Sequence, residues 1–440
     1  MFNCVDIVYV STIKIESTYS IRDLSKLVPL ISQGGTESRH SNSSSSTDDA
    51  SHHLLMAYHR NDSMLFTKEY LSRNRFVRII IKAPTAKEPW LTRTLVILTI
   101  FSTGIAVLSL WIQAQDITLD KLLQLRQVRL SYWLPTEQLT IRFALPSELG
   151  GGEESLGILE LVNKYARLIE KMLSKCFGKT KAEIASTYPV IFIRQMGKAR
   201  DRSELRTLVR DQLSSLLFDT YSWKYLSDQV SDIPDISPFV LLNRFVTDVC
   251  TLELFTQQGE NELAMYAAKD HLDVEEEFMG QESSTVIILE ILRMLLTTLA
   301  VIDSILDQKK STNIDDIARL KMRIFYLLNE YNAVTIASRH LEYNFFLYGK
   351  RVMNFEGLYS QVMTKIDILE RLAQTSYQRR HDRRMIALEI LAIGVATSVV
   401  IGPLFESMFK LTVAQKIVLT FEPLLIALFI ILLLQDNNFE

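Results

Sequence analysis

Residues 94–112 read TLVILTIFSTGIAVLSLWI, nineteen consecutive positions without a charged side chain. A helix needs about 20 predominantly apolar residues to cross the roughly 30 Å hydrocarbon layer of a bilayer. Trp90 and Trp111 bracket the run, and at about 1.5 Å per helical residue they lie about 31 Å apart, as residues in two interfacial belts would. The sequence therefore predicts a transmembrane helix at 94–112.

The overall composition excludes several classes of protein. Hydrophobic residues make up 48% of the 440 positions, charged residues 22%, and there are only 15 glycines and 10 prolines, which excludes a disordered or collagen-like chain. The formal net charge of -3 shows no basic excess, so nucleic acid is not an expected partner. Three widely spaced cysteines form neither a disulfide framework nor a zinc pattern, and we expect no metal and no cofactor.

Two further apolar runs lie near the C-terminus, at 385–405 and 417–434, joined by the short segment 406–416. They predict a transmembrane helical hairpin over 385–434. Gly394, Ser398 and Gly402 recur every fourth residue in the first run. Such a face of small residues allows a neighbouring helix to approach closely inside lipid, although small residues are also common in spans that pack against nothing.

A fourth apolar run, 285–306, carries Glu290, Arg293 and Asp303. The favourable contribution of its apolar side chains to the free energy of membrane insertion and the unfavourable contribution of its charges nearly cancel. The preferred interpretation is therefore a buried core helix, and the alternative is a fourth span. The expected fold class is thus a mainly α integral membrane protein with three transmembrane helices, or four. A helical soluble domain and a small α+β N-terminal module would complete it.

The regions outside the predicted spans differ in pattern. Residues 1–86 indicate the small α+β module, interrupted by a disordered polar insert at 32–53, and 114–313 indicate a mainly helical soluble domain with a β-hairpin at 128–145. The apolar residues within 314–384 recur every three or four positions, as they do in amphipathic stalk helices. This spacing favours a coiled coil and therefore a homo-oligomer or a partner protein. The acidic segment that ends at Glu282 is typical of a solvated surface.

An arginine cluster ends the predicted stalk directly before the apolar run that begins at Met385. It consists of Arg379, Arg380, Arg383 and Arg384. Counts of Lys and Arg near the span ends do not decide the orientation of three spans and favour four. Because this cluster adjoins its span directly, we expect it to dominate and to place 114–384 in the cytoplasm. Its charges are candidates for contact with lipid head groups.

Ionisable groups inside lipid are costly and often functional. The intramembrane polar candidates are therefore Glu389 and Glu422, and Glu290 and Arg293 if 285–306 spans the bilayer. The alternative for Glu389 and Glu422 is that both side chains reach the nearby interface. The chain contains no H-E-x-x-H, G-x-S-x-G or complete P-loop motif, so no catalytic residue is expected and the protein is not expected to be an enzyme.

Two hypotheses about function follow. The first is a membrane-anchored scaffold or regulatory protein that acts through self-association or partner binding of its helical domain, with the lipid bilayer as a second partner. The second is an ion channel or transporter subunit. Over 314–434 the long stalk, the basic cluster and the two-span hairpin resemble the layout of CorA-type magnesium channels. Their Gly-Met-Asn signature is absent from residues 406–416.

Overall fold

The computed structural model describes part of the chain. The described residues are 2–17, 54, 56–62, 76–126, 139–194, 203–204, 207, 214–217, 236, 242–269, 274–308, 317–322, 324–325, 340–408, 417–418, 421–422 and 425–430. Residues 32–53 and 128–134, which the sequence assigns to a disordered insert and to one strand of a hairpin, lie outside this set.

The strands of the described part are β1 (Phe2–Ser17), β2 (Phe76–Ile81), β3 (Thr85–Ala86), β4 (Leu91–Phe101), β5 (Ile105–Ile117), β6 (Ile141–Ala144), β7 (Glu153–Leu156), β8 (Thr180–Arg194), β9 (Leu242–Val246) and β10 (Thr251–Phe255). Its helices are α4 (Leu119–Arg126), the short 3-10 helix η3 (Ser147–Leu149), α5 (Ile158–Phe177), α7 (Ser214–Leu217), α9 (Gln257–Lys269), α10 (Val274–Gln308), α13 (His340–Val352) and α14 (Phe355–Met408).

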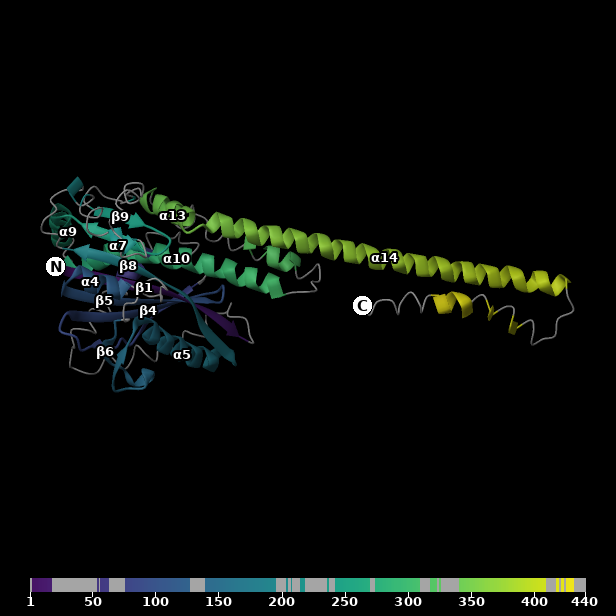
Figure 1. Cartoon of the computed structure of the whole chain (residues 1–440), viewed down its shortest axis with the longest axis horizontal. Coiled ribbons are helices and arrows are strands. Elements are labelled where there is room, and N and C mark those ends of the chain that lie inside the picture. Colours follow the sequence, from purple (N-terminus) through teal and green to yellow (C-terminus); the bar gives the residue numbers. More distant parts are fainter. Residues whose placement is uncertain are drawn as a thin grey trace. The chain divides into compact units, whose positions relative to one another are not determined.

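A seven-stranded sheet organises most of these elements (Figure 1). Its order is β2-β4-β5-β1-β8-β10-β9, and every neighbouring pair is antiparallel except β8 with β10. The central strand β1 lies at the N-terminus of the chain and pairs with β5 on one side, Val5 facing Ala114, and with β8 on the other, Val5 facing Ile193. The sheet therefore combines strands from both sides of residues 86 and 114, at which the sequence predicted the limits of separate regions.

Helices cover both faces of this sheet. Side chains alternate between the faces of a strand, and on β1 Val5, Ile7 and Tyr9 enter the apolar core that contains eight buried side chains of α5. Asp6 and Thr12 point to the opposite face, where they contact Arg194 of β8 and Thr297 of α10. The fold is an α/β/α arrangement of layers, with α5 below and α10 above the sheet in Figure 1.

A second, three-stranded sheet has the order β3-β6-β7. In it β6, which lies in the predicted hairpin region 128–145, pairs with β3 and β7, Phe143 facing Ala86 and Glu154. Leu156 and Phe143 are buried in the same core as α5. This small sheet thus extends the α5 side of the main sheet.

The predicted transmembrane helix at 94–112 is wrong, because these residues form an antiparallel pair of strands, β4 and β5. Leu98 faces Leu108 and Ile97 faces Ser109 across the pair. The chain reverses at Gly104, whose φ of 87° lies in the left-handed region that glycine adopts without strain. Both faces of the two strands are covered, so the apolar and polar positions do not alternate and the sequence reads as one apolar run.

The tryptophan near the end of this run is a core residue. Trp111 is 5% exposed and its ring stacks against Phe192 of β8, with ring centroids 6.3 Å apart and an interplanar angle of 4°. It meets the ring of Tyr58 edge-on, also at 6.3 Å. Trp111 therefore packs between a strand and a helical segment, and the match to an interfacial belt was coincidental.

The expected fold class, a mainly α integral membrane protein with three or four transmembrane helices, is corrected by the seven-stranded mixed sheet. Within the described residues, one helical segment, Phe278–Asp307, is long and apolar enough to cross a membrane, and 78% of its most apolar stretch is buried inside the protein. This segment belongs to α10 and contains the run 285–306. It lies against β1, β5 and β8, as the core-helix interpretation requires.

The chain divides into two compact units. One comprises Met1–Gln308 and Met322–Val362, the other Lys309–Lys321 and Met363–Glu440, and α14 contributes to both. In the second unit the Lys321 ammonium lies 3.3 Å from Asp367 and 3.0 Å from Glu370. Along α14 the side chains are partly or fully buried at intervals of three and four residues up to Ala373.

The hairpin turn at Gly104 gives a prediction about stability. A Cβ at position 104 would meet only the Ile15 carbonyl oxygen, at an ordinary 3.7 Å, so the cost of Gly104→Ala comes from its backbone conformation. We expect the substitution to lower the free energy of unfolding by about 1–2 kcal/mol. Denaturant unfolding followed by tryptophan fluorescence measures the change. An unchanged midpoint would contradict the turn and favour the continuous helix.

Candidate functional site

The most concentrated set of buried charges lies between α10 and the sheet, and we call it the charge layer. Its members come from strands, from a helical segment and from α10 itself, and their side chains are at most 5% exposed. They are Asp6, Asp62, Arg78, Arg194, Arg244, Glu253, Glu282 and Glu290. A buried charge without a partner is strongly unfavourable, so these groups have to pair with one another.

Glu290 is the centre of the first cluster. It is fully buried on α10, and one carboxylate oxygen accepts hydrogen bonds from Arg78 and Thr99, both at 3.1 Å. The other oxygen accepts from Ser109 at 2.6 Å and from the Tyr58 hydroxyl at 3.4 Å. Three strands, β2, β4 and β5, and the helical residue Tyr58 thus converge on one side chain of α10.

Arg78 holds this cluster together. Its guanidinium also bonds Asp62 and donates to Thr99 at 3.1 Å, and it lies 4.5 Å from the centre of the Tyr58 ring. Burial alone would lower the pKa of this arginine, but the charges of Asp62 and Glu290 outweigh it and raise the pKa above the ordinary value. Arg78 therefore stays charged.

The carboxyl of Glu290 is affected in the opposite sense by its surroundings. Burial, which disfavours the charged form, raises its pKa above the ordinary 4.5, and Arg78 and Ser109 offset only part of that effect. Asp62, a second carboxyl bonded to the same guanidinium, adds to the increase. Burial likewise raises the pKa of the Tyr58 hydroxyl, which keeps it a neutral donor.

The second cluster joins α10 to β1 and β8. Arg194 donates to Glu282 through Nε at 2.9 Å and contacts the carboxylate of Asp6 at 2.7 Å through Nη2. Its guanidinium lies 4.4 Å from the centre of the Phe278 ring. Glu282, which the sequence analysis assigned to a solvated acidic segment, is fully buried in this cluster.

The third cluster joins α10 to β9 and β10. Arg244 bonds Glu253 on the neighbouring strand and donates to the Thr285 hydroxyl at 2.6 Å, and that hydroxyl donates to Glu253 at 2.6 Å. The guanidinium of Arg244 also lies 4.6 Å from the centre of the Phe345 ring of α13. This cluster therefore links the sheet, α10 and α13.

Arg293, the second charge predicted in the run 285–306, points elsewhere. It is half-buried, and its guanidinium lies 5.2 Å from the centre of the Tyr188 ring of β8. Glu290 and Arg293 thus face different strands. Both lie at the interface between α10 and the sheet.

The charge layer has the properties of a structural element. Its five carboxyls and three guanidiniums bond one another and neighbouring hydroxyls. In the part of the chain that the structure describes, no group of three or more His, Cys, Asp or Glu side chains could hold a metal ion. The layer orients α10 on the sheet. Local sequence patterns could not reveal it because the arginines that bond Glu282 and Glu290 of α10 are far away in the chain.

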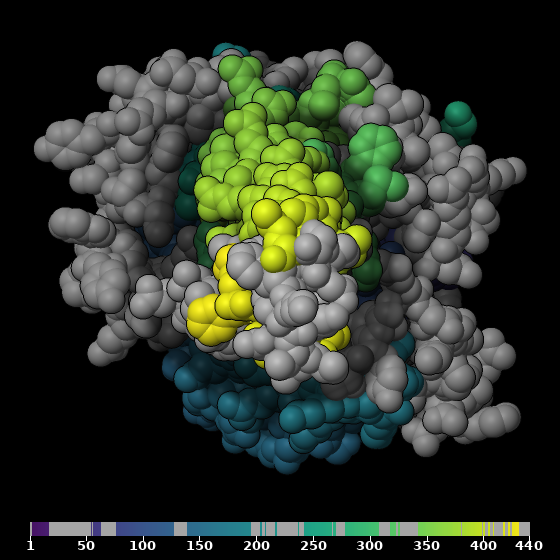
Figure 2. Space-filling view, turned by 90° about the vertical axis from the view of Figure 1, so that its right-hand side faces the viewer, coloured from purple at the N-terminus to yellow at the C-terminus, as the bar shows by residue number. Residues whose placement is uncertain are grey.

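The other candidate residues lie on the C-terminal segments. Glu389 on α14 and Glu422 are both exposed. Around them, α14 from Met385 onward exposes large apolar side chains by 40% to 70%: Met385, Ile386, Leu388, Leu391, Ile393, Val395, Val399, Val400, Leu404 and Met408. We call this stretch, 385–408, the apolar end of α14. Residues 417–430 also expose most of their described side chains, and Figure 2 shows both segments at the surface in yellow-green and yellow.

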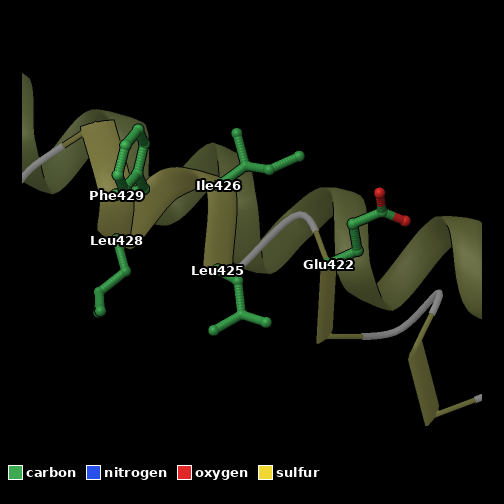
Figure 3. Close-up of a pocket in the computed structure, with 5 residues that line it drawn as sticks. All are labelled: Glu422, Leu425, Ile426, Leu428 and Phe429. Carbon is green, nitrogen blue, oxygen red and sulfur yellow. The ribbon is translucent and has the colours of Figure 1, made fainter.

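A shallow depression of about 450 Å³ lies on the last of these segments, lined by Glu422, Leu425, Ile426, Leu428 and Phe429. Figure 3 shows Leu425 and Leu428 pointing away from Ile426 and Phe429, so the apolar side chains do not converge on an enclosed space. Its shape is that of an open apolar surface with one carboxylate at the edge.

One side of the apolar end is less exposed than the rest. At about 100° per residue its ten exposed apolar side chains cover an arc of about 260°. The remaining arc holds Gly394, which is buried, and Ala387, which is half-buried. The side chains of Ser398 and Gly402, predicted on the same helix-packing face, lie outside the described set. In the arginine cluster, Arg379, Arg383 and Arg384 are exposed.

Comparison with protein-family models, with curated proteins and with solved structures finds no match to this chain.

Arg78 provides the test of the charge layer. Replacing it by methionine leaves the carboxyls of Glu290 and Asp62 buried without their cation, so we expect Arg78→Met to lower the free energy of unfolding by about 3–5 kcal/mol. The matched control is Arg142→Met, because Arg142 is an exposed arginine on β6 and should change stability by less than about 0.5 kcal/mol. Equal effects in urea unfolding would show that the layer does not stabilise the fold.

The raised pKa of Glu290 predicts a pH dependence. As the pH rises above 4.5 the unfolded chain loses this proton before the folded chain does, so the stability that Glu290 contributes falls with increasing pH until its folded-state pKa is reached. Relative to Glu290→Gln, which cannot ionise, the wild-type protein should lose about 1.4 kcal/mol per pH unit in this window. Urea unfolding of both proteins from pH 4.5 to pH 8 checks the slope, and a difference that stays constant or grows contradicts it.

Proposed function

We propose that this chain is a membrane-anchored scaffold or regulatory protein without catalytic activity, and that its C-terminal segments attach the α/β unit to a bilayer. One observation carries the proposal: the apolar end of α14 exposes large apolar side chains over about 260° of its circumference. A helix of a water-soluble domain normally exposes its polar face and buries its apolar one.

The dimensions of the apolar end fit a bilayer. Its 24 residues, 385–408, form a helix about 36 Å long, which exceeds the roughly 30 Å of hydrocarbon. Moving ten half-exposed apolar side chains out of water contributes on the order of 10 kcal/mol. Glu389 lies only about 6 Å from the start of the stretch, near the interface where a charge costs least.

The scaffold role rests on how α14 begins. α10 packs against α13, and α14 follows α13 after Asn354, whose φ of 53° marks the break between the two helices. The stalk part of α14, 363–384, exposes Ile368, Leu372 and Tyr377 between 52% and 65%. These side chains offer a surface for self-association or for a partner protein. We expect stalk residues 363–384 on the cytoplasmic side, because the arginine cluster adjoins the membrane.

An ion channel or transporter subunit is the second candidate. The observation that favours it is that α14 is one uninterrupted helix from Phe355 to Met408. The stalk would therefore continue directly into the first membrane segment. The likeness to CorA-type channels rests on this layout. Glu389 and Glu422 are the carboxylates that such a pore would use. Glu422→Gln in proteoliposomes discriminates: loss of cation flux supports transport, and flux at background in the wild-type protein excludes it.

Two matched variants test the anchor. We expect Leu388→Lys/Ile393→Lys/Val399→Lys to release the full-length protein from membranes during alkaline extraction, because each charge costs about 2.5–3.5 kcal/mol in the hydrocarbon. The control, Ile368→Lys/Leu372→Lys/Tyr377→Lys, changes three side chains of the stalk that are comparably exposed. It should stay in the membrane fraction. Release of both variants, or of the wild-type protein, contradicts the anchor.

The same pair of variants tests the scaffold. Crosslinking in native membranes should show wild-type oligomers, or an adduct with a partner protein, and the stalk variant should lose them because its lysines repel one another and prefer water. If the wild-type protein yields only monomers, the proposed scaffold role fails even if the anchor holds.

A further inference from the structure

The arginine cluster before the apolar end has a defined position on α14, and we call it the arginine collar. It consists of Arg379, Arg380, Arg383 and Arg384. The helix is continuous through the junction with Met385, so the collar has the same axis as the apolar end. Arg379 and Arg384 lie about 7.5 Å apart along that axis.

This length matches the polar layer of a membrane. A bilayer of about 40–45 Å with a hydrocarbon core of about 30 Å leaves roughly 5–8 Å of head groups on each side. If the hydrocarbon begins at Met385, all four arginines lie at the depth of the lipid phosphates. Tyr377, 65% exposed, comes one turn before Arg380, and tyrosine is enriched at this interface.

The collar keeps an excess of positive charge. The four arginines occupy an arc of about 140° on the helix, and Asp382 lies outside that arc. The next acids towards the N-terminus, Asp367 and Glu370, contact Lys321. Residues 376–384, SYQRRHDRR, therefore carry a formal charge of +3. A guanidinium group binds phosphate oxygens through two parallel hydrogen bonds. A diffuse electrostatic attraction to counterions does not need this bidentate geometry.

We propose that the arginine collar binds the phosphate groups of anionic phospholipids, so that the apolar end enters an anionic leaflet in preference to a neutral one. The proposal rests on the proposed membrane anchor and names its lipid partner. Each basic residue near an anionic surface strengthens binding about fivefold, so four together should give a preference on the order of a hundredfold or more.

The experiment uses the full chain, made by cell-free synthesis without detergent in the presence of vesicles. One set of vesicles is phosphatidylcholine alone, and the other is phosphatidylcholine mixed with phosphatidylglycerol. Flotation over a series of lipid concentrations gives the half-saturating lipid concentration for each. The wild-type chain should need about a hundredfold less lipid when phosphatidylglycerol is present, and high salt should reduce that ratio.

The collar variant is Arg379→Gln/Arg380→Gln/Arg383→Gln/Arg384→Gln, and its ratio should fall below about fivefold. A control variant removes four exposed positive charges from α5 and the turn after it, Arg167→Gln/Lys171→Gln/Lys175→Gln/Lys179→Gln, and it should keep the wild-type ratio. Thermal unfolding followed by tryptophan fluorescence should give the wild-type midpoint for both variants, because all the changed residues with described side chains are exposed.

The outcomes separate the two proposals. Flotation of the wild-type chain with both lipids at equal half-saturation overturns the collar's lipid preference and leaves the anchor standing, whereas no flotation with either lipid overturns the anchor and the collar with it. A preference that survives in the collar variant also overturns the proposal. Inorganic phosphate at constant ionic strength should leave the preference unchanged, and its loss would mean that the collar is a site for free phosphate.

Discussion

The structure depends on one helix, α10, which covers a face of the seven-stranded sheet and places charged side chains in the interface between them. Arg78, Arg194 and Arg244 lie on three strands of the sheet, and α10 provides Glu282, Thr285 and Glu290 opposite them. Glu282 and Glu290 are eight residues apart, about 12 Å along the helix. A rotation or a one-turn slip of α10 would separate the buried guanidiniums from their carboxylates, so these contacts hold the helix in one register.

The same contacts also hold α13, the helix that precedes α14, in place. The Arg244 cluster reaches Phe345 on α13, and α13 is followed by α14. A buried salt bridge adds little net stability compared with an apolar contact, but its partners tolerate few alternative arrangements. The charge layer therefore accounts better for the position of α10 and α13 than for the overall stability of the unit, to which the apolar core around α5 also contributes.

Sequence patterns predicted the helices better than the sheet. The run 285–306 was interpreted as a core helix because its charges opposed insertion, and α10 is buried against the sheet. The run 94–112 was misinterpreted because strands covered on both faces lose their alternation, and the turn at Ser102-Thr103-Gly104 was the only local signal of a hairpin. Glu282 was assigned to the surface because its partner Arg194 lies 88 residues away in the chain, beyond any local pattern.

Two apolar helices in this chain thus have opposite relations to their surroundings. α10 buries most of its most apolar stretch and directs Glu282 and Glu290 into the contact with the sheet, whereas the apolar end of α14 exposes most of its described large apolar side chains. Site-directed spin labelling along α14, one position at a time from 363 to 408 in the reconstituted full chain, tests this difference most directly. We expect labels before 385 to contact a water-soluble relaxation agent with a period of 3.6 residues, and labels from 385 onward to contact oxygen dissolved in the bilayer instead. Contact with the water-soluble agent along the entire helix would contradict it.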